Sequence, residues 1–152
     1  MVNGVTSVVL AALFLLPCLA ASAADRYEDD WSYRIKPWKR EPVVGVRVGA
    51  AGLGDAARDP ASEPEPCATF RPGEDQIRAF FARAKRVSQR AFLHETDWSA
   101  CYATGTLFLR GGVEASWTVQ RFGAGYLKID GAPYYFDCSS CRLGVPVGAA
   151  KP

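Results

Sequence analysis

Cys138 and Cys141 are the residues of this sequence whose type and spacing come closest to a known chemistry. A Cys-x-x-Cys pair can be a redox-active dithiol when its first cysteine lies at a helix N-terminus, because the helix dipole there lowers the thiol pKa. The segment that follows, Arg142 to Pro146, is too rich in helix breakers to form that helix. We therefore expect a structural role for both cysteines, and thiol–disulfide redox chemistry is the alternative function.

Four cysteines remain for a folded domain when Cys18, which lies in an apolar N-terminal segment, is set aside: Cys67, Cys101, Cys138 and Cys141. An even number of cysteines in an exported chain favours two disulfides. A four-cysteine zinc site is less favoured, because two of the cysteines are single and widely spaced and the compartment is oxidising. We expect no metal and no cofactor. Of the three pairings, we expect Cys101 bonded to Cys138 or Cys141, and Cys67 bonded to the other.

His94 is the single histidine of the chain, and it begins the sequence His94-Glu95-Thr96-Asp97-Trp98. A zinc-protease helix needs a second histidine four residues after the first, where this chain has tryptophan. No serine is framed by Gly-x-Ser-x-Gly, so a hydrolase triad lacks support as well. These observations favour a protein that is not an enzyme, and they leave the question open.

Basic residues gather in and after the segment with the clearest helical pattern, and Arg83 and Arg86 stand near its end. Together with His94 and Trp98 they are our candidate binding surface, although a basic helix face is most often simply solvated. Binding of single-stranded nucleic acid needs aromatic residues interleaved with basic ones on a sheet face, which this sequence does not predict. The net charge of +2 also implies no general attraction to nucleic acid.

The first 24 residues carry no Asp, Glu, Lys or Arg. Their apolar core, Val8–Leu16, is followed by small residues at 20–24 with the spacing that signal peptidase accepts. We therefore expect residues 1–24 to be a signal peptide and the protein to be periplasmic or secreted. An uncleaved membrane anchor is the alternative, because Val5–Ala24 has about the length that a bilayer needs. The excess of Arg over Lys, with abundant Ala and Gly, is typical of a GC-rich bacterial genome.

The remainder of the chain has the length of one domain. Residues 25–66 are first charged and then rich in Ala, Gly and Pro, which predicts a disordered or weakly ordered tail with a short strand at Val43–Val48. Residues 67–143 are predicted to fold as a small domain. Residues 144–152 are predicted to be a frayed C-terminal tail.

Residues 67–143 show one helical pattern followed by several strand patterns. Ile77, Phe80, Phe81 and Ala84 share one face of a helix predicted over Pro72–Val87. Alternating residues and glycine-rich turns then predict five strands, over Arg90–Glu95, Tyr102–Arg110, Val113–Gln120, Tyr126–Ile129 and Tyr134–Asp137. The predicted fold class is α+β, with one amphipathic helix packed on an antiparallel meander of four to five strands.

The meander also predicts where the cysteines lie. Cys101 precedes an early strand and Cys138 follows the last one, so alternating strand directions bring both to the same end of the sheet, together with Cys67 and Cys141. We therefore expect disulfides at one edge of the domain. An exported, stapled domain without a convergent catalytic set favours a non-enzymatic binding protein that recognises another protein, in an inhibitor- or immunity-type role. We expect no nucleic-acid partner, and no membrane partner unless residues 1–24 are retained.

Overall fold

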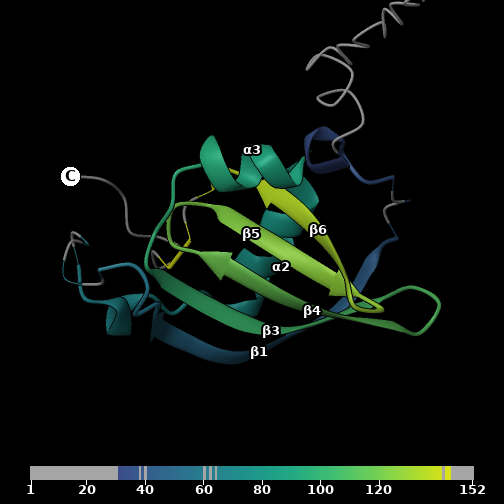
Figure 1. Ribbon diagram of the computed structural model, residues 1–152. Coiled ribbons are helices and arrows are strands. Elements are labelled where there is room, and N and C mark those ends of the chain that lie inside the picture. The colour runs from purple at the N-terminus through teal and green to yellow at the C-terminus, as the bar shows by residue number, and fades with distance from the viewer. Residues whose placement is uncertain are drawn as a thin grey trace, which may run out of the picture. The chain divides into compact units, whose positions relative to one another are not determined.

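The computed structural model describes residues 31–37, 39, 41–59, 61, 63, 65–141 and 143–144 (Figure 1). The predicted signal peptide, residues 1–24, lies outside the described residues, as does most of the predicted C-terminal tail. In this part of the chain, the 3-10 turns η1 (Trp31–Tyr33) and η3 (Cys67–Thr69) and the α-helices α2 (Glu74–Arg83) and α3 (Gln89–His94) accompany an antiparallel sheet. The α+β class is confirmed, but the numbers of strands and helices differ from those predicted.

The sheet has six strands in the order β1-β3-β4-β5-β6-β2, and every neighbouring pair is antiparallel. The central four strands are β3 (Cys101–Leu109), β4 (Val113–Gln120), β5 (Ala124–Ile129) and β6 (Ala132–Asp137). They form the predicted meander. β1 (Val43–Gly54) and β2 (Lys85–Val87) add one strand at each edge.

Two hairpins of the meander close through the turns that their sequences predict. Gly111 and Gly112 both adopt positive φ, at 91° and 80°, between β3 and β4. Asp130 and Gly131 do the same, at 50° and 78°, between β5 and β6. Positive φ at both central residues matches the twist of the flanking strands, and it explains why glycine occupies three of these four positions.

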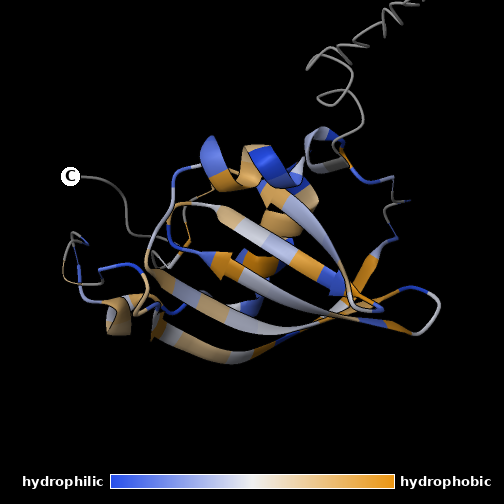
Figure 2. Ribbon diagram, in the orientation of Figure 1, coloured by the Kyte–Doolittle hydropathy of each residue, from blue (hydrophilic) through white to orange (hydrophobic). Residues whose placement is uncertain are grey.

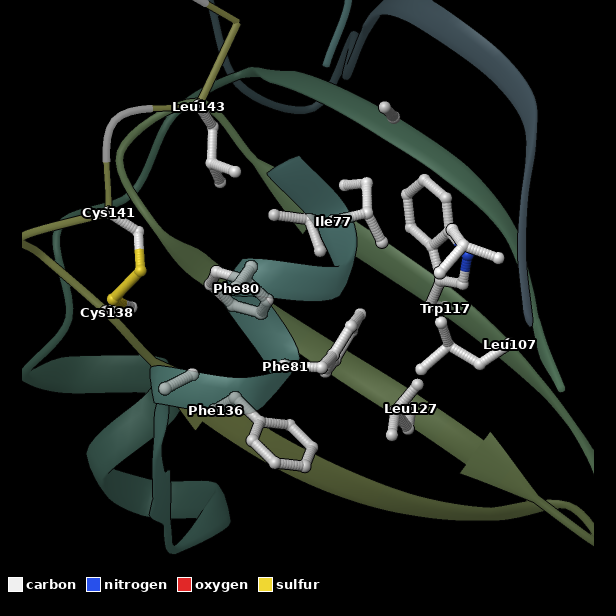
Figure 3. Packing of buried hydrophobic residues seen from close by; sticks show 14 of the residues in the cluster. Ile77, Phe80, Phe81, Leu107, Trp117, Leu127, Phe136, Cys138, Cys141 and Leu143 are labelled. Carbon is white, nitrogen blue, oxygen red and sulfur yellow. A yellow bond between two sulfur atoms is a disulfide. The ribbon is translucent and has the colours of Figure 1, made fainter. Parts of the chain in front are cut away.

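Helix α2 (Glu74–Arg83) packs on one face of the sheet, and the apolar residues predicted for the buried face of the helix make this contact. Figure 3 shows Ile77, Phe80 and Phe81 of α2 pointing toward buried side chains of the sheet, which are Leu107, Trp117, Leu127 and Phe136. The three α2 side chains are at most 4% exposed, so each contributes about 1.5–3 kcal/mol by burial. This layer between α2 and the sheet is the core of the domain.

The helix is shorter than the predicted Pro72–Val87. It ends at Arg83 because Ala84 turns to an extended conformation, and Lys85–Val87 then pairs with the end of β6 as strand β2. At the other end, the Gln76 side chain accepts a hydrogen bond from Gly73 N at 3.0 Å and helps to start the helix. Arg83 and Arg86, close in sequence, therefore belong to different elements.

The predicted strand over Arg90–Glu95 is wrong, because this segment forms helix α3 (Gln89–His94). Ser88 caps the helix, and its Oγ accepts a hydrogen bond from Ala91 N at 3.1 Å. Phe92 packs against Tyr135 and Tyr126, whose neighbours Phe136 and Leu127 face α2. Successive residues of a strand point to opposite faces, so α3 covers the face of the sheet away from α2 (Figure 1).

Strand β1 corrects the prediction that residues 25–66 form a tail. Its 12 residues pair with β3 from Val43, opposite Leu109, to Gly54, opposite Cys101. The predicted short strand over Val43–Val48 is the first half of β1. Figure 2 shows residues of mixed hydropathy along β1, as a half-covered edge strand requires.

Candidate binding site

The two disulfides join Cys67 to Cys101 and Cys138 to Cys141. All four cysteines lie at one end of the sheet, as predicted, because β3 begins at Cys101 and β6 ends just before Cys138. The predicted pairing is wrong. β3 and β6 are separated by β4 and β5, which places their ends about 14 Å apart at the usual strand spacing. Bridged Cα atoms lie within about 7 Å.

The Cys138–Cys141 disulfide closes a turn, in which Cys141 N donates to Cys138 O at 2.9 Å. Both cysteines are buried in the core, at 7% and 5% exposure, beside Leu143 (Figure 3). Residues 143 and 144, the described residues that follow the motif, are not helical. The geometry that lowers the pKa of a redox-active thiol is therefore not found in the described part of this turn.

An open cleft of about 620 Å³ reaches Cys141, and Trp98 and Arg121 also line it. Arg121 is held in place by Glu65 O and Pro66 O, at 2.7 and 2.9 Å, and by the Glu63 carboxylate at 3.5 Å. This cation thus anchors the segment before η3.

The predicted binding residues do not form one surface. Trp98 is half-buried, because its indole N–H donates to Phe92 O at 2.9 Å and the Arg58 guanidinium covers its ring at 3.7 Å. His94 is exposed at the end of α3, and Arg83 is exposed at the end of α2. Arg86 is the one predicted residue that lines a cavity with other cations.

That cavity, which we call the basic cavity, has a volume of about 360 Å³ and lies beside the β2 edge of the sheet. Three separate chain segments line it: the residues after η1, the residues from β2 into α3, and the start of β6. The described residues that line it are Arg34, Lys36, Pro37, Arg86, Val87, Gln89, Pro133, Tyr134 and Tyr135.

The strand pairing explains why a cavity forms here. β2 pairs with β6 only at Tyr135, Phe136 and Asp137, so the first residues of β6 extend beyond β2. Pro133 lies in this extension and has no backbone N–H to donate to a further strand. The segment from Arg34 to Pro37 borders the space instead.

Cations are grouped around one aromatic ring in the basic cavity. The Lys36 ammonium lies 5.0 Å from the centre of the Tyr134 ring, and the Arg86 guanidinium lies 5.7 Å from it. Both distances fall within the range of cation–π attraction, which holds the charged groups near the wall. Arg34 adds a third cation, and none of the described residues in the lining is Asp or Glu.

Two polar groups complete the lining. Burial, and then the neighbouring Tyr126, raise the pKa of Tyr135 above its ordinary value of 10.0, so its phenol stays neutral near pH 7. Gln89 Oε1 is shielded from water and accepts no hydrogen bond from the described residues. A buried acceptor of this kind normally has a partner.

Sequence reasoning found Arg86 and missed the remaining residues of the basic cavity. The available signal was the basic and aromatic composition of residues 33–40, within the segment predicted as a tail. Tyr134 and Tyr135 were predicted only as sheet residues. Nothing in the local sequence indicates that these segments meet.

Searches of protein-family models, curated proteins and solved structures return no match to the chain. Within the described ranges, no three His, Cys, Asp or Glu residues are grouped so that they could hold a metal ion. In the same part of the chain, no helix has the length and apolar character needed to cross a membrane.

Proposed function

We propose that this domain is a non-enzymatic binding protein that recognises another protein by holding an acidic group of that partner in the basic cavity. It acts in the periplasm or outside the cell, in an inhibitor- or immunity-type role. The observation that carries the proposal is the convergence of Arg34, Lys36 and Arg86 on one cavity, whose lining includes no acidic residue among those that the structure describes.

Charge distribution supports this proposal more strongly than net charge does. The chain has 18 Lys and Arg and 16 Asp and Glu, so its net charge is only +2. Three of the described basic residues line the basic cavity, and the 15 other basic residues of the chain are outnumbered by its acidic residues. A local basic site on a nearly neutral protein selects an acidic partner without general affinity for polyanions.

Binding of a fluorescent peptide rich in Glu tests the proposal. The control is the same peptide with Gln in place of every Glu, which removes the charge of the side chains. We expect the exported, disulfide-bonded protein to bind the Glu peptide at low salt and to bind the Gln peptide at least tenfold more weakly. Charge-assisted hydrogen bonds contribute about 1.5–3 kcal/mol each, and 1.4 kcal/mol corresponds to tenfold in affinity.

Two double variants and one matched control locate the site. Lys36→Gln with Arg86→Gln should weaken binding of the Glu peptide at least tenfold. Arg34→Gln with Lys36→Gln changes only exposed side chains and should do the same without loss of thermal stability. Arg47→Gln, on β1 at the opposite edge of the sheet, should bind like the wild type. Equal binding by all three variants would overturn the proposal.

Thiol–disulfide exchange is the second candidate, because Cys138 is bonded to Cys141 within one motif, as in a redox pair. Its test is the mass of the protein after mild reduction and alkylation. Labels on Cys138 and Cys141, with Cys67 and Cys101 unmodified, would support redox chemistry. Resistance of both disulfides to mild reductant would support their structural role.

A further inference from the structure

A second cavity lies between helix α2 and the chain segment that leads into β1, and we call it the α2 cavity. Its volume is about 360 Å³, at the small end of the range for ligand pockets, about 300–1,000 Å³. It shares no described lining residue with the basic cavity. The α2 cavity is therefore a separate site, and its size suits a small molecule.

The accessible wall of the α2 cavity is largely apolar. Pro42 and Ala82 are exposed and Val43 is half-buried, so all three offer surface to a ligand. An apolar group of the ligand would therefore rest on these three side chains. The core residues behind them, three of which Figure 3 labels, are at most 4% exposed and offer little surface: Phe81, Leu107, Leu109 and Leu127.

Two opposite charges complete the described lining, and backbone hydrogen bonds hold both of them near the segment before β1. Arg78 of α2 is the cation, and its Nη1 donates to Val43 O at 3.2 Å. Glu41 is the anion, and the carbonyl of the next residue, Pro42, accepts a hydrogen bond from Arg110 N at 2.9 Å. One small cavity is thus bordered by one positive and one negative side chain.

These two charges are not paired with each other. Within the described ranges, Glu41 and Arg78 form no ion pair, and the Glu41 carboxylate accepts no hydrogen bond. The Arg78 guanidinium uses one N–H on Val43 O and keeps further donors. A ligand with a single charge would be repelled by one of the two side chains. A neutral apolar ligand would shield both charges from water without a partner, which is unfavourable.

We infer that the α2 cavity binds a free apolar amino acid, with its carboxylate on Arg78, its ammonium on Glu41 and its side chain on Pro42, Val43 and Ala82. An amino acid carries these three groups on one carbon atom, so it gives each charge an opposite partner and covers the apolar wall. This inference goes beyond the proposed function and does not depend on the basic cavity.

Leucine and three analogues, each lacking part of this pattern, test the inference by calorimetric titration of the exported, disulfide-bonded protein. Isocaproate is leucine without its amino group, and isoamylamine is leucine without its carboxylate. Leucine acetylated on its nitrogen and amidated at its carboxylate keeps the side chain and loses both charges. Leucine should bind about tenfold more tightly, or better, than each analogue, because every analogue lacks at least one charge-assisted hydrogen bond.

Two single variants assign each charge of the ligand to its partner. Arg78→Gln should weaken binding of leucine and isocaproate about tenfold and leave isoamylamine unchanged. Glu41→Gln should weaken binding of leucine and isoamylamine and leave isocaproate unchanged. The matched controls are Arg83→Gln and Glu114→Gln, which remove the same charges at exposed positions outside the lining and should bind like the wild type. Thermal unfolding without ligand checks that each variant is folded.

Each contrary result overturns the inference in a different way. Failure of leucine to bind would show that the cavity is not an amino-acid site. Equal affinity for leucine and isocaproate would show a site for anions, and equal affinity for leucine and isoamylamine a site for cations. Equal affinity for leucine and its blocked form would leave apolar contact alone. Leucine binding that both cavity variants leave unchanged would place the site elsewhere. None of these results bears on binding of the Glu peptide at the basic cavity.

Discussion

The two disulfides should stabilise the domain to different extents, because they close loops of very different length. Cys67–Cys101 spans a sequence separation of 34, and Cys138–Cys141 spans 3. A cross-link stabilises a protein mainly by reducing the entropy of the unfolded chain, and this effect grows with the loop. The chain-entropy relation gives about 3.8 kcal/mol at 25 °C for the long loop and about 1.9 kcal/mol for the short one.

The perturbation is the removal of one disulfide at a time by paired substitution with alanine. Loss of packing should differ less between the two variants, since Cys101, Cys138 and Cys141 are buried and Cys67 is partly buried. We expect Cys67→Ala with Cys101→Ala to lower the free energy of unfolding by about 2 kcal/mol more than the paired change at Cys138 and Cys141.

Urea unfolding followed by tryptophan fluorescence measures both free energies. The slope of the free energy against urea concentration should rise when the long loop is opened, because the unfolded chain then exposes more surface. The slope should change little when the short loop is opened. Equal losses from the two variants, or a larger loss from the short loop, would refute the reasoning from loop length. The Cys138–Cys141 turn would then stabilise the core through its own packing.

Two further predictions concern single residues of the sheet. Desolvation, and then the charge of Asp97, raise the pKa of Asp137 above its ordinary 3.8, with Lys85 opposing them. The folded state therefore binds this proton more tightly than the unfolded state, and stability falls as pH rises above 3.8 through the raised pKa. Asp137→Asn should be more stable than the wild type at pH 7, and the difference should vanish below pH 3.8 in urea titrations. Gly105→Ala should destabilise by about 1–3 kcal/mol or more, because a Cβ there would meet the Trp117 ring at 2.6 Å and a backbone oxygen of β1. Gly73→Ala, with nothing within 4 Å, is the matched control, and thermal unfolding that gives equal losses would contradict the packing argument.

The elements that could be predicted are those whose structure depends on nearby residues. The hairpins at Gly111-Gly112 and Asp130-Gly131 follow from backbone conformations that few other residues adopt, so the turns could be placed from the sequence. The apolar face of α2 follows from helical spacing. In these cases the local sequence and the fold favour the same conformation.

The elements that were missed depend on distant partners. β1 is rich in glycine and alanine, and it is ordered because β3 supplies its hydrogen bonds from residues 47 to 66 positions later in the chain. α3 has six residues, too few to separate helical from strand spacing, and its identity depends on the Ser88 cap and on aromatic residues of β5 and β6. The disulfide pairing depends on the strand order, which places β4 and β5 between two cysteines that share one edge.

The basic cavity could not be predicted for a further reason, which concerns Arg83 and Arg86. Both were assigned to one binding surface because they belong to the run of basic residues near the end of the predicted helix. The chain leaves the helix between them, so Arg86 joins Arg34 and Lys36, which come from the segment that composition assigned to a tail. Net charge hides this grouping, because acidic residues elsewhere in the chain nearly cancel it. A cavity lined by cations from distant segments thus depends on the short strand β2, whose pairing with β6 places Arg86 beside Tyr134.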